Sequence, residues 1–320
     1  MNADLVLEGG GVKGIGLAGA LSALEAGGYE FPRIAGTSAG ALLGALAAAG
    51  YDASELRELM ATIDYRQFAD TSLLDRLGAL GKSLSVIFEQ GVYEGAKLRD
   101  WVAEKLAAKG VETFADLRIP DDPASDLPPE RRYRLVVMAS DVSRGRLARL
   151  PWDYAQYGLD PDRQRVADAV RASTSIPFYY EPVRLTGGHG WENVLVDGGM
   201  LSNFPIEVFD RRDGKPPRWP TFGVKLSAEP GAARRPTAVD NTFEFAKVLV
   251  MTMMQFHDQM HLDDPAVLAR TMFVDTLRVR ATDFDLDPDT QTQLYDNGRV
   301  AAERFLAGWD FDAYVDAFRR

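Results

Sequence analysis

Leu5-Val6-Leu7-Glu8-Gly9-Gly10-Gly11-Val12-Lys13-Gly14 and Arg33-Ile34-Ala35-Gly36-Thr37-Ser38-Ala39-Gly40 are the two stretches that decide the fold. In each, a short apolar run ends in glycines and is followed by a pattern of small and apolar residues typical of a helix. Two successive strand–helix units predict a parallel sheet. The expected elements are a strand at 4–8, a helix at 13–27, a strand at 32–36 and a helix at 38–50.

The second stretch contains the pattern Gly-x-Ser-x-Gly at a strand-to-helix junction. Such a pattern is typical of a nucleophile elbow, a turn so tight that the neighbours of the serine must be very small. Gly36 and Gly40 meet that requirement. The sequence therefore predicts that Ser38 presents its hydroxyl at the edge of the sheet as a nucleophile.

The first stretch predicts an oxyanion hole made by Gly9, Gly10, Gly11, Lys13 and Gly14. Consecutive glycines leave backbone N–H groups bare and able to face a developing negative charge. The helix expected next would add the positive end of its dipole. The Lys13 side chain would either neutralise charge or cap the loop, and the sequence does not choose between these roles.

A serine nucleophile needs a base, and Asp197 in Val196-Asp197-Gly198-Gly199 is the strongest candidate. A carboxylate at the end of an apolar strand lies where catalytic groups of open α/β sheets collect. Gly198 and Gly199 allow another chain segment to come close. Taken alone the pattern also fits an ordinary Asp-Gly turn. Because the chain also contains the elbow and the glycine loop, we favour the interpretation of Asp197 as the base.

The three histidines are weaker candidates. His189 lies between glycines and is expected in a surface turn. His257 and His261 are four residues apart on an expected helix, a spacing that resembles the zinc motif H-E-x-x-H. The base position of that motif holds the shorter Asp258, and no third ligand follows. We expect polar surface histidines, no metal and no cofactor.

The composition of the chain excludes some classes of protein and disfavours others. The chain has 320 residues, of which 46% are hydrophobic and 26% charged, and it lacks cysteine, which excludes disulfides. A net charge of −11 argues against nucleic acid and disfavours docking on anionic lipid. No apolar run reaches the roughly 18 residues of a membrane-spanning helix. The start of the chain lacks a positive signal region. We expect a cytoplasmic or membrane-peripheral protein, with export by a route without a signal left open.

The breaks in the pattern favour one domain over residues 1–320. Within it we expect a helical insertion at about 52–130 and a helical C-terminal region at about 240–320. A glycine-containing stretch at 78–95 is expected to be a surface loop, with a mobile cover as the alternative. Further elements are expected as strands at 134–139, 194–196 and 221–224 and as helices at 241–262 and 288–306.

Taken together, these motifs resemble the patatin-like phospholipase family. The resemblance rests on residues 9–14, 36–40 and 197–199 in the order of the family, and also on 172–177 and 203–205. It extends over about residues 3–225. It implies a three-layer α/β/α sandwich with a mostly parallel central sheet, and hydrolysis of acyl esters of phospholipids or related lipids.

The resemblance also implies roles for single residues. Ser38 would be the nucleophile, Asp197 its only side-chain base, and the N–H groups of Gly10 and Gly11 the chief oxyanion donors. The implied partner is a lipid or acyl-ester substrate met in transient contact with a membrane surface. The oligomeric state is not implied.

Three other hypotheses stay open. A Ser38–Asp197–His257 triad has the chain order of the α/β-hydrolases, although few strands precede the elbow and His257 falls within a helix. Gly9, Gly11 and Gly14 fit the G-x-G-x-x-G of nucleotide-binding proteins, but the second strand lacks the acidic end that binds ribose. A non-catalytic lipid-binding module would keep the motif shapes without turnover.

Two basic stretches and one apolar stretch have no assigned role. The basic residues are expected to form solvated faces, with contact to lipid phosphates as the alternative. The apolar helix expected from residue 243 to 251 is interpreted as core, with an acyl-chain groove as the alternative. The basic residues are Arg144, Arg146 and Arg149 in an expected hairpin, and Arg211, Arg212, Lys215 and Arg218.

Overall fold

The computed structural model describes residues 1–63, 95–121, 127–226 and 264–319 except 278 and 284, together with Phe245, Val248, Leu249 and Thr252. Apart from those four residues, the expected helix at 241–262 lies outside the described residues, as do His257, His261 and nearly all of the 78–95 stretch. The same holds for the middle of the expected helical insertion.

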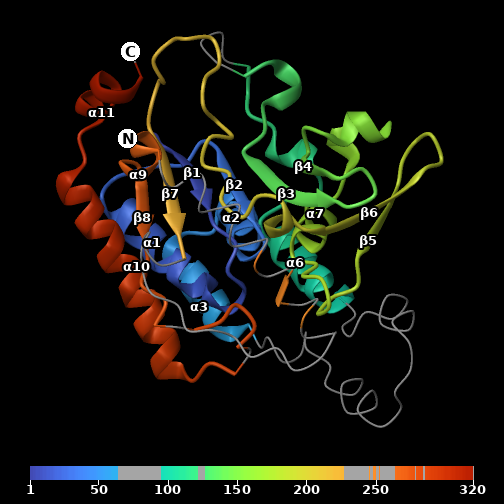
Figure 1. Cartoon of the computed structure of the whole chain (residues 1–320), viewed down its shortest axis with the longest axis horizontal. Coiled ribbons are helices and arrows are strands. Elements are labelled where there is room, and N and C mark those ends of the chain that lie inside the picture. Colours follow the sequence, from blue (N-terminus) through green and yellow to red (C-terminus); the bar gives the residue numbers. More distant parts are fainter. Residues whose placement is uncertain are drawn as a thin grey trace.

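One eight-stranded mixed sheet forms the centre of the described chain (Figure 1). Its order is β5-β6-β3-β2-β1-β7-β8, and β4 pairs with β3. The pairs β1–β2, β1–β7, β2–β3 and β7–β8 are parallel, whereas β3–β4, β3–β6 and β5–β6 are antiparallel. The strands are β1 (Asp4–Leu7), β2 (Ile34–Thr37), β3 (Leu135–Asp141), β4 (Arg146–Leu150), β5 (Val183–Thr186), β6 (Glu192–Asp197), β7 (Thr221–Lys225) and β8 (Thr271–Phe273).

The opening β–α–β–α order is confirmed, with shifted boundaries. The helix expected at 13–27 is a 3-10 turn, Gly11–Gly14, followed by α1 (Ile15–Ala26). The next helix, α2 (Ala39–Ala48), is almost completely buried. Small residues let α2 approach the sheet closely, since a side chain at Gly44 would meet Ile34 Cγ2 at 3.0 Å. Helix α2 therefore packs directly behind the strand that leads to Ser38.

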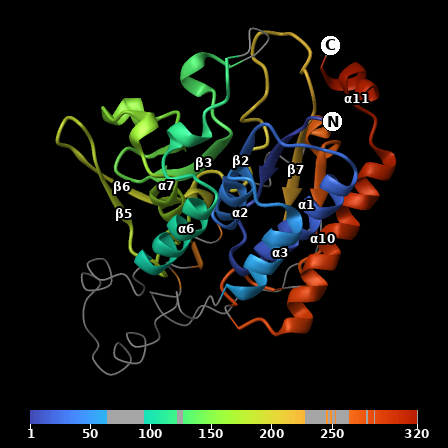
Figure 2. The same ribbon diagram turned by 180° about the vertical axis from the view of Figure 1, so that it is seen from behind.

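The two faces of the sheet are covered differently (Figures 1 and 2). Helix α2 packs on one face, and α10 (Pro288–Gly308) reaches the same face through Phe305, whose ring lies 5.1 Å from that of Phe222 on β7. The opposite face is covered by residues 201–220, which the structure describes as turns without an α-helix. Phe204 from this segment fills the space above Gly223, the residue next to Phe222.

The remaining helices lie around α1 and α2. Helices α1 and α10 interlock through glycines, because a Cβ on Gly19 would lie 1.9 Å from the carbonyl oxygen of Tyr295. The expected helix at 288–306 is confirmed by α10. The other helices are α3 (Ala53–Thr62), α6 (Ala96–Ala108), α7 (Val166–Ser173), α9 (Pro265–Leu268) and α11 (Phe311–Phe318).

The strands expected at 134–139, 194–196 and 221–224 are confirmed by β3, β6 and β7. The hairpin expected around Arg144 is also confirmed, as the turn between β3 and β4. Strands β5 and β8 were not anticipated, since each is short and polar residues interrupt its pattern. Among the described residues, no helix has the length and apolar character needed to cross a membrane.

Candidate active site

Strands β2 and β6 approach each other along the same edge of β3. Thr37, the last residue of β2, pairs with Met138, and Asp197, the last residue of β6, pairs with Ala139. The other edge of β3 is occupied at both positions by β4. Because β2 and β6 run in opposite directions, their ends meet, and Ser38 and Asp197 come from neighbouring positions along β3.

This arrangement differs from the one expected for Asp197. The sequence suggested a strand that ends at the carboxyl edge of a parallel sheet, but β6 is antiparallel to β3. Strand β6 begins near the carboxyl end of β3 and runs along β3 in the opposite direction. Asp197 reaches the level of Thr37 because β6 stops there, at the turn that begins with Gly198.

The backbone of Ser38 has the geometry of a nucleophile elbow. Its φ of 52° and ψ of −120° are unusual for a residue with a side chain and store strain between β2 and α2. The flanking glycines are required by contact. A Cβ on Gly36 would lie 2.3 Å from the carbonyl oxygen of Gly40, and one on Gly40 would lie 2.3 Å from that of Leu7.

A second serine holds the elbow in place. The backbone N–H of Ser38 donates to Ser173 Oγ at 2.9 Å, and Ser173 Oγ donates to the carbonyl oxygen of Met138 at 2.5 Å. Ser173 is completely buried at the end of α7. The sequence offered only one signal for it, its position in the 172–177 stretch that resembles the family.

Asp197 is buried, and its two carboxylate oxygens have different surroundings. Oδ1 accepts a hydrogen bond from the N–H of Gly199 at 2.8 Å. Oδ2 has no hydrogen-bond partner among the described residues. Burial raises the pKa of Asp197 to about 6, against the smaller lowering effects of the Ser38 side chain and the Gly199 N–H. The Ser38 side chain is thus close enough to act on the carboxyl group.

The backbone N–H groups of the glycine loop after β1 differ in whether they already donate a hydrogen bond within the protein. The N–H of Gly9 donates to the carbonyl oxygen of Asn203 at 3.1 Å, and Asn203 Nδ2 donates back to the carbonyl oxygen of Gly9 at 3.1 Å. The N–H groups of Gly10 and Gly11 meet no acceptor among the described residues. Of the residues predicted for the oxyanion hole, Gly10 and Gly11 are therefore the ones with donors available.

Gly9 has a different role from the one expected, because its N–H is occupied. A Cβ at this position would lie 2.1 Å from Asn203 Oδ1 and 3.2 Å from Ser38 Cβ. Gly9 thus lets the loop pass close beside Ser38. The N–H of Lys13 also stays within the loop, where it donates to the carbonyl oxygen of Gly10 at 3.2 Å. Gly14 is buried, and a Cβ there would contact Met60 Cε and Ala39 Cβ at 3.1 and 3.2 Å.

Two lysines tie the glycine loop to the end of β7. Lys13 Nζ donates to the carbonyl oxygen of Leu226 at 3.0 Å, which supports the capping role of the two considered. Beneath the loop, the buried carboxylate of Glu8 pairs with the buried ammonium of Lys225 and accepts from the N–H of Leu226. These contacts join the carboxyl ends of β1 and β7. They therefore restrain the position of the loop that follows β1.

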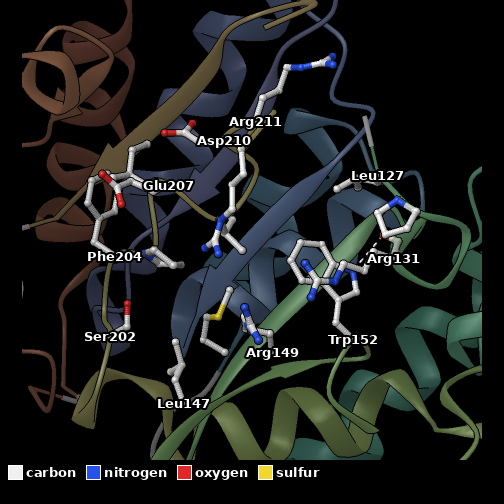
Figure 3. A pocket seen from close by; sticks show the side chains of 16 residues that line it. Leu127, Arg131, Leu147, Arg149, Trp152, Ser202, Phe204, Glu207, Asp210 and Arg211 are labelled. Carbon is white, nitrogen blue, oxygen red and sulfur yellow. Dashed lines mark hydrogen bonds between the residues drawn. The ribbon is translucent and has the colours of Figure 1, made fainter. Parts of the chain in front are cut away.

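A pocket of about 300 Å³ lies on the face of the sheet opposite α2, near the end of the strand that leads to Ser38 (Figure 3). Ser202 lines it, and the carbonyl oxygen of Ser202 accepts a hydrogen bond from Thr37 Oγ1 at 3.1 Å. Figure 3 shows Arg131 beside Trp152, and the guanidinium carbon of Arg131 lies 5.3 Å from the centre of the Trp152 ring. Ser38 and Asp197 do not line this pocket.

The one described histidine lies close to Asp197 in the sequence but not at the same end of β6. His189 is exposed in the turn between β5 and β6, as expected, at the opposite end of β6 from Asp197. Within the described ranges, no three His, Asp or Glu side chains are grouped as metal ligands.

A strand–helix elbow beside a glycine-rich loop, at the carboxyl ends of parallel strands, is the architecture of an ester hydrolase. The comparisons with known proteins agree. The chain belongs to the patatin-like phospholipase family, whose family model matches residues 5–210. It is accordingly an enzyme, a carboxylic ester hydrolase.

Relatives and solved structures extend this likeness. The Bacillus subtilis uncharacterized protein YqhO is 37% identical over 97% of this chain and 100% of its own length. A cGAMP-activated phospholipase of Pseudomonas aeruginosa is 29% identical over 63% of this chain and 53% of its own length. A cUMP-AMP-activated phospholipase of Escherichia coli is 25% identical over 82% of this chain and 79% of its own length. The crystal structure of VipD from Legionella pneumophila shares the fold, with a TM-score of 0.52, 20% identity and coverage of 98% of this chain and 67% of VipD.

Proposed function

We propose that the chain hydrolyses fatty-acyl ester bonds of phospholipids or related lipids through an acyl-enzyme on Ser38, with Asp197 as the base. One observation carries this proposal. Asp197 Oδ2 is buried, has no hydrogen-bond partner among the described residues, and belongs to a carboxyl group whose pKa the Ser38 side chain lowers. An unused acceptor in that position is ready to take the proton of the serine hydroxyl.

The raised pKa makes Asp197 a better base than an exposed carboxylate. A carboxylate with an ordinary pKa near 4 is a weak base for a hydroxyl group. Burial raises the pKa of Asp197 to about 6, which brings it closer to neutral pH while leaving it mostly ionised there. Proton transfer and attack on the ester carbonyl still have to be concerted, so that charge moves directly onto an oxygen held by donors.

The proposed reaction has two steps. Ser38 Oγ forms a bond to the acyl carbon as its proton passes to Asp197, and the proton then goes to the alcohol that leaves. The carbonyl oxygen carries the negative charge between the N–H groups of Gly10 and Gly11. Water next attacks the acyl-enzyme, gives its proton to Asp197 and releases the fatty acid, and the proton returns to Ser38.

The proposal includes the organisation of the chain and its surroundings. We place the reaction in one domain over residues 1–320, with the insertion at about 52–130 and the C-terminal region at about 240–320 as parts of it. The enzyme would meet its lipid at a membrane surface in transient contact, as a cytoplasmic or membrane-peripheral protein. The net charge of −11 favours neutral over anionic lipid surfaces as the general docking surface.

The dyad is tested by two substitutions. Ser38→Ala removes the nucleophile, and Asp197→Asn keeps the shape of the side chain but removes the basic oxygen. We expect each variant to lose at least a thousandfold in kcat on a p-nitrophenyl acyl ester and on phospholipid vesicles, with the fold unchanged by circular dichroism. Ser22→Ala, in which a hydroxyl bonded to the carbonyl oxygen of Gly19 is lost, is the matched control. Near-normal turnover by the Asp197→Asn variant would refute the dyad.

The triad alternative is decided by His257→Ala. If Asp197 is the only side-chain base, this variant keeps its kcat within a few fold, whereas a triad would lose most of it. A non-catalytic lipid-binding module is tested separately with a fluorophosphonate probe. We expect the probe to label the wild type at Ser38 and to leave the Ser38→Ala variant unlabelled.

A further inference from the structure

A small basic pocket lies at the amino ends of the parallel strands, on the edge of the sheet opposite to Ser38. It is lined by Asp4 and Thr221, the first residues of β1 and β7, by Arg33 directly before β2 and by Arg270 directly before β8. Helix α11 closes it through Tyr314. Figure 1 shows the N-terminus, the start of β7 and α11 at this same end of the molecule.

The pocket concentrates positive charge in a chain whose net charge is −11. Its lining has six cationic side chains and only two carboxylates, Asp4 and Asp210. Both carboxylates are already paired, Asp4 with Arg33 through two hydrogen bonds of 2.8 and 2.5 Å. The cationic residues are Arg33, Arg211, Lys215, Arg218, Arg270 and Arg319.

Asp210 is shared by two guanidinium groups. Both terminal nitrogens of Arg270 donate to it, at 2.6 and 2.7 Å, and Arg319 donates to its Oδ2 at 2.6 Å. A single carboxylate therefore faces two positive charges. Arg211 pairs with a third carboxylate, Asp213, and the six cations still outnumber these three carboxylates.

Two buried donors that line this pocket have no partner among the described residues. Arg270 is 2% exposed, and its Nε makes no hydrogen bond. The indole Nε1 of Trp219 is also buried and makes none. A buried donor without an acceptor destabilises the folded state. Two of them at one cationic pocket indicate an acceptor group that fits there.

We propose that this pocket binds a phosphate group, at a site separate from the catalytic one. A phosphate has several acceptor oxygens and more than one negative charge, which match donors that converge from different strands. The pocket has a volume of about 40 Å³, compared with the roughly 10–15 Å³ needed for one water. It therefore takes the phosphate group itself, and the rest of the ligand stays outside, near the exposed Lys215 and Arg218.

The phosphate has two possible sources, a membrane lipid headgroup or a soluble phosphate compound. Arg33 and Arg218 lie over the ring of Trp219, at 5.6 and 4.7 Å from its centre. These contacts hold the indole in the lining of the pocket for either source. The inference does not depend on the identity of the catalytic base, so its test is independent of turnover.

The test measures binding of inorganic phosphate by calorimetry and by the shift of Tm, against sodium chloride of equal ionic strength. Trp219→Phe removes only the indole N–H, and Lys215→Gln removes one exposed charge. We expect the double variant to bind phosphate at least tenfold more weakly than the wild type. The matched control combines Trp191→Phe and Arg163→Gln, whose side chains are exposed and lie outside the pocket.

A second arm separates the sources. Flotation with phosphatidylcholine vesicles, with and without phosphatidic acid, shows a lipid source if phosphatidic acid increases binding of the wild type and the control but not of the double variant. If binding to vesicles is the same for all three proteins, the source is a soluble phosphate compound. The proposal is overturned if phosphate has no more effect than chloride, or if the double variant and the control bind it equally.

Discussion

The backbone N–H of Ser38 is held by the hydroxyl of Ser173, at 2.9 Å, from a helix that begins more than 120 residues later in the chain. The same hydroxyl donates to the carbonyl oxygen of Met138 on β3. Ser173 therefore connects the strained elbow to the strand that also pairs with Asp197. The position of Ser38 relative to Asp197 depends on this contact.

Ser173→Ala is expected to lower kcat at least tenfold with little change in KM. The substitution leaves the N–H of Ser38 and the carbonyl oxygen of Met138 buried without partners, at a cost of about 1–3 kcal/mol for each group. Part of that cost is relieved by a shift of the elbow, which moves the nucleophile away from its base. Steady-state kinetics on a soluble ester measure the effect, and Ser22→Ala is again the control.

The pH profile of kcat/KM is expected to fall below about pH 6. Protonated Asp197 cannot accept the proton of the serine, and burial raises its pKa to about 6. A histidine base would titrate in a similar range. The two are separated in a less polar solvent mixture, which raises the pKa of a carboxyl group and lowers that of an imidazolium. A downward shift of the profile would contradict a carboxylate base.

Asp197→Asn is expected to stabilise the folded protein at pH 8 while it abolishes turnover. The pKa of Asp197 is raised from 3.8 to about 6, so the folded state binds more protons than the unfolded state between these values. Stability from this group is thus present at low pH and is lost as the pH rises to about 6. The difference between these two pKa values corresponds to about 3 kcal/mol, an upper value for the gain.

Urea unfolding at pH 4 and pH 8 measures this gain. The difference in the free energy of unfolding between variant and wild type should be small at pH 4 and largest at pH 8. Asp100→Asn, at an exposed carboxyl group, is the control and should show no comparable change with pH. An equal difference at both pH values would mean that ionisation of Asp197 is not costly.

Gly9→Ala is expected to reduce kcat about a hundredfold or more, although the N–H of Gly9 is not free. The added methyl would lie 2.1 Å from Asn203 Oδ1 and close to Ser38 Cβ, so the loop has to move. Loss of one oxyanion donor costs about 10²–10³ in kcat in other hydrolases. Gly308→Ala is the matched control, because nothing lies within 4 Å of its added carbon. Equal activity of both variants would show that the loop tolerates the displacement.

Lys225→Met is expected to destabilise the fold by about 3–5 kcal/mol, because it leaves the buried Glu8 carboxylate without its cation. The double variant with Glu8→Gln should recover most of the loss, since the uncompensated charge is then absent. Urea unfolding measures both variants. Arg184→Met breaks an exposed pair with Glu192 and should cost no more than about 1 kcal/mol.

Local sequence was sufficient for the parts of this protein that short-range sterics decide. Glycines on both sides of Ser38 are required by contacts within and next to a single turn, so the elbow was predictable from five residues. The alternation of apolar runs with small-residue helix patterns likewise predicted β1, β2 and their parallel pairing. Strands β3, β6 and β7 were predictable because each contains a short apolar run, at 134–139, 194–196 and 221–224.

Tertiary structure alone decided how the distant pieces meet. That β6 runs antiparallel to β3 and ends against the end of β2 depends on pairing between residues far apart in the chain, which no local spacing encodes. The engagement of the Gly9 N–H by Asn203 and of the Ser38 N–H by Ser173 follows from the same packing. Residue types limit what chemistry a chain can offer, but hydrogen bonds and pKa values depend on neighbours, and neighbours are set by the folded sheet.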